Sequence, residues 1–296
     1  MLETNFNGFG YRQTLKNQIN GWLAEDVGSG DVTTATTIPA ESQSKAVIHV
    51  KESGIIAGLP VAQLVFEVVD PSLVFEAKVA DGDYVEKGTV IAIVEGSTHS
   101  LLTGERLALN LMQRLSGIAT KTNAFVAALE GLPVRLVDTR KTTPGHRLLE
   151  KYAVRIGGGS NHRFGLYDAV MIKDNHIKGA GGIREAVEAS RASIPHTMKI
   201  EVETESMEQV EEALACGADI IMLDNMSPSL MKEAVARIKS HSPRVIVEAS
   251  GNVRLDTIHA IALSGVDVIS VGGLTYSFNA LDISLDLNAK KGGSAS

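Results

Sequence analysis

Six short runs of β-branched and aliphatic residues recur through the second half of the chain, and they constrain the fold more than any other feature. Segments with helix-like patterns separate them, and each interval is long enough for a strand, two turns and a helix. This alternation is typical of βα units built on a parallel sheet. The runs span residues 134–138, 169–173, 199–203, 220–224, 245–248 and 268–272.

Six βα units fit either an open doubly wound sheet or a (β/α) barrel, and charged residues at the strand ends favour the barrel. In a barrel the carboxyl ends of all strands meet at one mouth, where active sites lie. The two-residue alternation also places Lys199, Glu201 and Glu203 on one face, and buried charges need partners or a ligand. We therefore expect an α/β barrel of six to seven strands, with charged strand ends at Asp138, Lys173, Glu203, Asp224 and Glu248.

The N-terminal part of the chain has a different pattern, in which alternating strands such as 46–50 and 73–77 are separated by glycine turns. This predicts an α+β domain. A long helix with one apolar stripe is predicted over 104–129, and it would link the two domains. Arg106 lies in the first turn of this predicted helix, where a cation opposes the helix dipole. Such a position indicates either a use elsewhere or an exposed arginine.

The length of 296 residues exceeds that of a usual single domain, so two domains are expected. Residues 1–116 would form the N-terminal domain, to which the C-terminal segment 275–290 would return. Residues 117–274 would form the barrel. The glycine-rich sequence after residue 290 indicates a disordered tail over 291–296.

The composition excludes several classes of protein. A hydrophobic content of 44% with 21% charged residues does not fit a disordered chain. No apolar run approaches the ~18 residues of a membrane span, and a net charge of −7 argues against a general nucleic-acid binder. The single Cys216 cannot form an intrachain disulfide, and the start shows no signal peptide. We expect a soluble, cytoplasmic protein.

Residues 135–163 form a basic segment within this acidic chain, with seven lysines and arginines against two acidic residues. Arg140 and Lys141 directly follow a predicted strand, which favours an anion site, because arginine binds carboxylate and phosphate groups bidentately. His162 and Arg163 follow the glycine run 157–159, in a predicted loop, and suit the same purpose.

The basic residues of the intervening helical stretch have a simpler interpretation. Arg147, Lys151 and Arg155 are spaced as on one side of a helix, and the favoured reading is a solvated helix face.

Glu203 and Asp224 end two successive predicted strands and suit a hard divalent cation or sugar hydroxyls. Mg²⁺ takes one or two carboxylates and completes its shell with water and phosphate oxygens. The alternative is a salt bridge to Lys173 or Lys199. A soft-metal site is disfavoured because Cys216 stands alone and the histidines lack metal-ligand spacing.

Small residues follow the last two predicted strands, at 250–252 and 272–273. Late βα loops of barrels often bind phosphate through backbone N–H groups, although turn glycines explain the sequence equally well. The chain has no P-loop, and the run 157–159 is not a dinucleotide fingerprint, so an NTPase or dinucleotide dehydrogenase is disfavoured.

Several motifs, found in family order over nearly the whole chain, resemble those of the quinolinate phosphoribosyltransferases. The most distinctive reads Asp-Thr-Arg-Lys-Thr-Thr-Pro-Gly over 138–145. The tail after about residue 289 falls outside the resemblance. The matching segments are 25–31, 104–110, 138–145, 158–163, 172–176, 223–225 and 248–251.

The resemblance implies an α/β-sandwich domain followed by an incomplete barrel, and a dimer or larger assembly of dimers. It also implies a reaction, in which quinolinate and phosphoribosyl pyrophosphate give nicotinate mononucleotide, pyrophosphate and CO₂ with Mg²⁺. This is a step of NAD biosynthesis.

The residue roles implied by the resemblance follow the same motifs. Arg140, His162, Arg163 and Lys173 would hold the quinolinate carboxylates, and Arg106 would arrive from the neighbouring subunit. Lys141 would meet the pyrophosphate or a carboxylate. Glu203 and Asp224 would meet Mg²⁺ and the ribose hydroxyls, and with Lys141 and Lys173 they form the expected catalytic set. The 5′-phosphate and the rest of the substrate would be bound by Thr139, Ser250, Gly251, Asn252, Val271, Gly272 and Gly273.

Two alternatives stay open. A paralogous phosphoribosyltransferase-like protein would share the fold and act on another aromatic acid. A non-enzymatic anion-binding protein would not need acidic strand ends beside basic ones.

Overall fold

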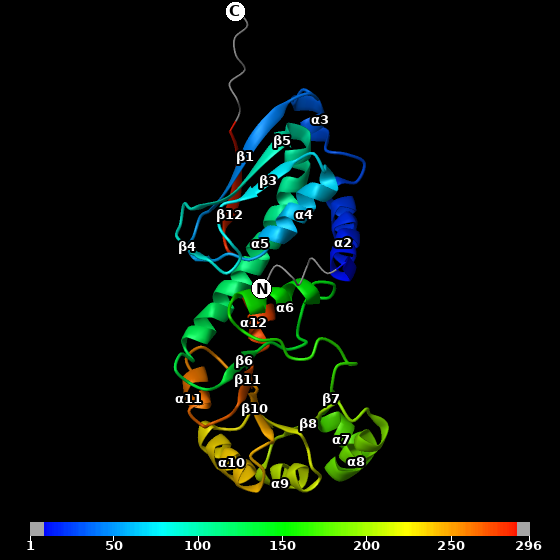
Figure 1. The fold of residues 1–296 in the computed structure, drawn as a ribbon, viewed down its shortest axis with the longest axis vertical. Helices are drawn as coiled ribbons and strands as arrows, with labels where there is room; N and C mark the ends of the chain where they lie inside the picture. The colour runs from blue at the N-terminus through cyan, green and yellow to red at the C-terminus, as the bar shows by residue number, and fades with distance from the viewer. Residues whose placement is uncertain (1–8, 289–296) are drawn as a thin grey trace, which may run out of the picture. The chain divides into compact units, whose positions relative to one another are not determined.

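The computed structural model describes residues 9–288, which divide into two compact units (Figure 1). Residues 9–120 and 279–288 belong to the first unit, and residues 121–278 form the second. The divisions therefore fall after Thr120 and Phe278, against predicted boundaries after residues 116 and 274. The predicted tail, 291–296, lies outside the described residues.

The first unit is built on a four-stranded antiparallel sheet in the order β12-β1-β5-β3. Alternate residues of β1, among them Ala46, Ile48 and Val50, are fully buried, which is the pattern of a sheet with one face on a core. Helix α4 packs against α2 and β3, and the short strands β2 and β4 pair separately. The strands are β1 (Gln43–Val50), β2 (Gly54–Ile55), β3 (Val74–Ala77), β4 (Tyr84–Val85), β5 (Val90–Ser97) and β12 (Ile283–Asn288). The helices are α2 (Phe9–Val27), α3 (Val32–Thr37), α4 (Leu59–Val69) and α5 (Thr98–Ala127).

The C-terminal segment returns to this unit and completes its sheet. The backbone of Asn279 lies against Gly117 on α5, where a Cβ atom would stand 2.1 Å from the carbonyl oxygen of Asn279. Leu281 then donates its N–H to the carbonyl of Gln113 at 3.0 Å, and β12 pairs with β1. Gly117 is therefore required by the close approach of two backbones.

Helix α5 begins earlier than its apolar stripe predicts, and this corrects the interpretation of Arg106. The helix starts at Thr98 rather than Gly104, so Arg106 lies in its third turn. The helix dipole acts on charges within the first turn, so it does not disfavour the charge of Arg106 in the third turn. The predicted conflict with the dipole was wrong.

The second unit is a six-stranded parallel sheet in the order β6-β11-β10-β9-β8-β7. Within this unit, the first strand in sequence, β6, pairs with the last, β11. Strands β6 and β7 lie at the two edges of the sheet. This is the topology of a (β/α) barrel opened between β6 and β7, as predicted. An isolated parallel bridge joins Val137 of β6 to Ser160, outside the six strands. The strands are β6 (Arg135–Val137), β7 (Val170–Ile172), β8 (Ile200–Thr204), β9 (Ile220–Asp224), β10 (Ile246–Ser250) and β11 (Val268–Ser270).

Helices α8, α9 and α10 lie along the outer side of the strands (Figure 1). Helix α8 packs against β7 and β8, α9 against β8 and β9, and α10 against β10. Val202, Ile221, Val247 and Ile269 are fully buried, which gives the near-continuous burial of a covered parallel sheet. The helices are α6 (Arg147–Ile156), α7 (Asp174–Ala180), α8 (Ile183–Ser193), α9 (Met207–Ala215), α10 (Pro228–His241), α11 (Ile258–Ala262) and α12 (Gly273–Tyr276).

Two charged residues depart from their predicted positions. Lys199 precedes β8 and is exposed, so only Glu201 and Glu203 of the predicted trio face inward from that strand. Asp138, which follows β6, is fully buried rather than open at the mouth. Among residues 9–288, no helix has both the length and the apolar character needed to cross a membrane.

Candidate active site

A cavity of about 510 Å³ opens at the carboxyl ends of the strands of the second unit. Charged side chains of both signs line it, and they come from segments that lie more than a hundred residues apart. Most of the predicted site residues meet here. The lining residues are Thr139, Arg140, Lys141, His162, Arg163, Met171, Lys173, Glu203, Met222, Asp224, Asn225, Glu248, Ser250, Gly251, Asn252 and Ser270.

Four predicted residues are not among the lining residues. Val271, Gly272 and Gly273 lie just beyond β11, and a Cβ atom on Gly272 would stand 2.9 Å from Cδ of Lys141. Gly272 therefore lies behind Lys141 and makes room for its side chain. Arg106 belongs to α5 in the first unit, whereas all the lining residues belong to the second.

The basic side of the cavity is formed by Arg140, Lys141 and Arg163. One guanidinium nitrogen of Arg163 donates to the carbonyl of Ala169 at 3.0 Å, which fixes that side chain. Burial and the nearby charge of Arg140 lower the pKa of Arg163, although a guanidinium remains charged. The Nε atom of Arg140 is buried, and within residues 9–288 no hydrogen-bond acceptor reaches it. Three cationic side chains on one side of an open cavity indicate an anionic ligand.

A buried ion pair behind the cavity holds the loop that carries His162. The ammonium of Lys151 on α6 binds the carboxylate of Asp138, and both side chains are almost completely buried. Asp138 also accepts the backbone N–H of His162 at 2.8 Å and the side-chain amide of Asn161 at 2.6 Å. The prediction of a solvated helix face was thus wrong for Lys151, which positions the site from beneath. It was also wrong for Arg147, which is half-buried and donates from its guanidinium to Thr142 and to the backbone carbonyls of Phe164 and Arg140. It holds for Arg155, which is exposed.

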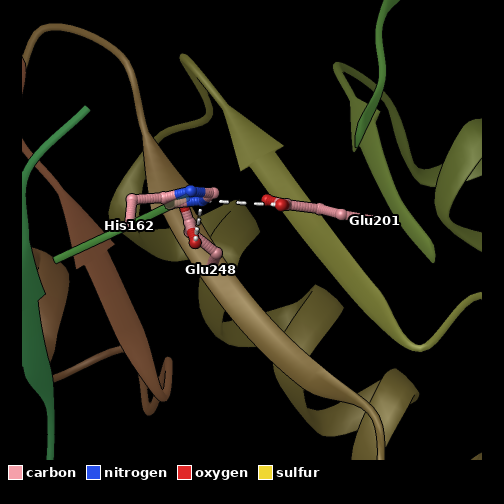
Figure 2. A group of neighbouring side chains, drawn as sticks. All are labelled: His162, Glu201 and Glu248. Atoms are coloured by element: carbon pink, nitrogen blue, oxygen red, sulfur yellow. Dashed lines mark ion pairs between the residues drawn. The ribbon is translucent and has the colours of Figure 1, made fainter. Parts of the chain in front are cut away.

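His162 lies between two buried glutamates, Glu201 from β8 and Glu248 from β10 (Figure 2). Its Nε2 atom is 3.5 Å from Oε2 of Glu201 and 3.4 Å from Oε2 of Glu248. Burial disfavours the charged imidazolium, but the hydrogen bonds and charges of the two glutamates outweigh it and raise the pKa of His162 to about 9. The N–H of Arg163 points at Nδ1 at 2.7 Å and opposes a second proton, yet one neutral dipole is weaker than two carboxylates.

These three side chains also have the spacing of a metal site, because their ligand atoms lie within 4.8 Å of one another. Coordination by Nε2 requires its lone pair to be free. The Arg163 N–H that points at Nδ1 favours the proton on Nε2 instead, and the imidazolium has no free lone pair at all. The three side chains are therefore better suited to keeping His162 protonated on Nε2 than to coordinating a metal ion.

The acidic side of the cavity is formed by Glu203 and Asp224, which project from the neighbouring strands β8 and β9. Glu203 pairs with the ammonium of Lys173, so the salt bridge considered from the sequence is present. Asp224 accepts the side-chain amide of Asn225 at 2.7 Å. Two carboxylates beside basic groups in one open cavity fit Mg²⁺, which takes one or two such ligands and shares the rest with water and phosphate.

Some lining residues were not predicted as part of the site. Glu248 stood at a predicted strand end and Asn225 directly after one. Glu201, which flanks His162 but is not a lining residue, stood on the predicted inner face. Only the fold shows that the two glutamates flank His162. The strand alternation was the available signal for Glu201. Met171, Met222 and Ser270 carry no chemical signal in the sequence, because apolar and small residues fill strand interiors everywhere.

The chain matches two family models that together cover most of its length. The N-terminal domain of quinolinate phosphoribosyl transferase matches residues 31–116, and the C-terminal domain of the same family matches residues 118–286.

Individual relatives agree with the family models. A Synechocystis protein named "Probable nicotinate-nucleotide pyrophosphorylase (carboxylating)" is 49% identical over 266 residues, covering 90% of each chain. The quinolinate phosphoribosyltransferase (decarboxylating) 1b of Nicotiana tabacum is 45% identical, covering 93% of this chain and 83% of its own. The crystal structure of NadC from Streptococcus pyogenes superposes with a TM-score of 0.87 at 44% identity, covering 91% of this chain and 94% of its own. The chain belongs to the quinolinate phosphoribosyltransferase family.

Proposed function

We propose that the chain transfers the phosphoribosyl group of phosphoribosyl pyrophosphate to quinolinate and releases pyrophosphate and CO₂, giving nicotinate mononucleotide for NAD biosynthesis. The observation that carries this proposal is the grouping of Arg140, Arg163 and His162 around one cavity, which carboxylates also line. A dicarboxylate supplies acceptors for several such donors at once.

Quinolinate would bind at the basic side of the cavity. Arg140 and Arg163 would take its carboxylates bidentately, with His162 as imidazolium and Lys173 completing the set. Each charge-assisted contact to a buried carboxylate contributes ~1.5–3 kcal/mol. The Asp138–Lys151 pair beneath the loop would keep His162 and Arg163 in place before the substrate arrives.

Phosphoribosyl pyrophosphate would bind across the acidic side. Glu203 and Asp224 would hold Mg²⁺ and the ribose hydroxyls, and Lys141 would meet the pyrophosphate or a substrate carboxylate. The 5′-phosphate would lie at the ends of β10 and β11, against Ser250, Gly251 and Asn252, with Val271, Gly272, Gly273 and Thr139 forming the surrounding backbone. Bound Mg²⁺ would neutralise charge on the departing pyrophosphate.

The chain's own residues would contribute mainly positioning and electrostatics. The arginines would hold the pyridine nitrogen facing the anomeric carbon, on the side opposite to the pyrophosphate. As the carbon–oxygen bond to pyrophosphate breaks, the nitrogen bonds to that carbon. The ring nitrogen then carries a positive charge and draws electrons. The bond to the adjacent carboxylate breaks, CO₂ leaves, and the ring carbon takes a proton from water.

We further propose that the chain acts as a homodimer, or a larger assembly of dimers, in which Arg106 reaches the site of the neighbouring subunit. The side chain of Arg106 is 59% exposed, and its ion pair with Glu105 spans 4.0 Å, so it is free to bind elsewhere. A cytoplasmic location suits the single cysteine, which has no second cysteine to pair with in the chain.

A product assay tests the proposal. Purified protein, Mg²⁺ and phosphoribosyl pyrophosphate are incubated with quinolinate in one tube and with nicotinate in another. We expect nicotinate mononucleotide only with quinolinate, with an equal amount of CO₂. Arg140→Ala should raise the KM for quinolinate strongly, while Arg155→Ala on the exposed face of α6 should not. Product from a different aromatic acid alone would reassign the substrate, and tight binding without turnover would indicate an anion-binding protein.

A further inference from the structure

The ends of β9 and β10 are joined by a chain of side-chain hydrogen bonds, and its middle residue, Asn225, has no role in the proposed chemistry. Asn252 donates its amide N–H to Oδ1 of Asn225 at 3.0 Å, and Asn225 donates its own amide N–H to Oδ2 of Asp224 at 2.7 Å. Because the Oδ1 atom of Asn225 accepts from Asn252, its NH₂ group is oriented toward Asp224. The three residues form a directed relay that ends on a carboxylate of the cavity.

The backbone is specialised to permit this relay. Asn225 and Asn252 are the non-glycine residues with positive φ within the described chain, at 54° and 47°. That conformation is costly for most side chains, and asparagine tolerates it better than most. Two such residues in contact at the mouth of one cavity indicate a functional constraint rather than chance.

Gly251 provides the space in which the side chain of Asn225 lies. A Cβ atom at this position would stand 2.3 Å from Oδ1 of Asn225 and 2.8 Å from its backbone nitrogen, and the φ of Gly251 is 87°. The backbone N–H of Asn225 also donates to the carbonyl of Ser250 at 3.0 Å, which extends the pairing of β9 with β10. Position 251 therefore requires glycine, because the side chain of Asn225 occupies the space that a Cβ atom would need.

We propose that Asn225 is a positioning residue, which fixes the carboxylate of Asp224 relative to the loop 250–252 so that the sugar and its 5′-phosphate are bound together. The inference rests on the proposed function, in which Asp224 and this loop contact opposite ends of the phosphoribosyl group. Asn225 acts through both neighbours. It keeps one oxygen of Asp224 engaged and thereby sets the direction in which the other oxygen faces.

The test uses Asn225→Gly, because glycine accepts the positive φ and loses only the side chain. We expect its thermal midpoint to stay near that of the wild type, its KM for phosphoribosyl pyrophosphate to rise about tenfold, and its KM for quinolinate to change little. Asn252→Gly cuts the far end of the relay and also removes a side chain placed against the 5′-phosphate, so it should raise the KM for phosphoribosyl pyrophosphate by at least as much. Gly251→Ala should reproduce the effect of Asn225→Gly by displacing its side chain.

A double-mutant cycle separates positioning from direct contact. In an Asp224→Asn background, Asn225→Gly should add little, because the residue through which it acts is already altered. If the fold-increases in KM for phosphoribosyl pyrophosphate of the two single variants multiply in the double variant, Asn225 binds the ligand itself, and the proposal is overturned. An unchanged KM for phosphoribosyl pyrophosphate in Asn225→Gly would overturn it as well.

Calorimetric titration with phosphoribosyl pyrophosphate and Mg²⁺ keeps this inference distinct from the proposed reaction. If the wild type binds the sugar but forms no nicotinate mononucleotide, the proposed function fails, and the relay is then judged on binding alone. We expect Asn225→Gly to weaken that binding about tenfold. A wild type that does not bind the sugar overturns both.

Discussion

Lys151 on α6 and Asp138 at the end of β6 form an ion pair in which the side chains are only 3% and 0% exposed. Burial works against both charges, raising the pKa of Asp138 and lowering that of Lys151. The pair persists because Asp138 also accepts hydrogen bonds from Asn161 and from the backbone of His162. It therefore ties a helix, a strand and the site loop together at one point.

Removing Lys151 should be severely destabilising. Lys151→Met leaves the Asp138 charge buried without its partner, which costs ~3–5 kcal/mol of unfolding free energy. Urea unfolding measures this cost, with Arg155→Ala on the same helix as a control that should change stability by less than ~0.5 kcal/mol. A loss for Lys151→Met no larger than that of the control would show that the pair does not hold the loop.

The His162 cluster predicts a pH-dependent stability. A histidine whose pKa rises to about 9 on folding stabilises the protein fully below its ordinary pKa of 6.5, and this contribution is lost as the pH rises through 9. Up to about 3 kcal/mol is involved. The difference in unfolding free energy between wild type and His162→Gln should therefore shrink between pH 6.5 and 9.

Two measurements separate this effect from general titration. Exposed His196→Gln, which removes a histidine outside the cluster, is the control for the substitution itself. NMR titration of the His162 ring should give a raised pKa in the wild type and a lower one in Glu248→Gln. An ordinary pKa in the wild type would contradict the assignment of the imidazolium.

Removal of Mg²⁺ and substitution of Glu203 should both impair the transfer of the phosphoribosyl group. We expect EDTA to abolish product formation and excess Mg²⁺ to restore it. Glu203→Gln should lower kcat/KM about 10- to 100-fold and raise the Mg²⁺ concentration needed for half-maximal rate. Its stability should change little, since Lys173 is 42% exposed and its ion pair is partly solvated. Exposed Glu205→Gln, at the end of the same strand, is the matched control.

Mixing two inactive variants tests whether Arg106 acts across a dimer. Arg106→Ala and Arg140→Ala should each lose most activity alone. In a mixed dimer, one site would combine Arg140 of one subunit with Arg106 of the other and be intact. Random reassociation should thus restore about a quarter of the wild-type activity. If mixing restores no activity, both arginines belong to the same site within one subunit. If Arg106→Ala is fully active, Arg106 is not part of the site.

Short-range patterns in the sequence predicted the strands of the second unit, because alternation and βα spacing are local properties. They also predicted that Lys173, Glu203 and Asp224 would meet, since the carboxyl ends of parallel strands share one edge, with Arg140 directly after such an end. That His162 joins them was implied only by the family resemblance. Long-range pairing was not predictable in this way. Nothing in the spacing of residues 138 and 151 indicates that Lys151 turns inward. The start of α5 at Thr98 precedes the apolar stripe, and its first three residues are polar.

The order in which the chain is synthesised has a consequence for its first unit. Strand β1 pairs on one side with β5 and on the other with β12, which follows the whole second unit in sequence. The second unit is continuous in sequence, and its sheet does not include that strand. Before β12 is made, the six-residue edge of β1 over 45–50 stays open to other chains. Translation stalled or truncated before β12 should therefore yield a protein with an intact barrel and a sheet edge prone to aggregation.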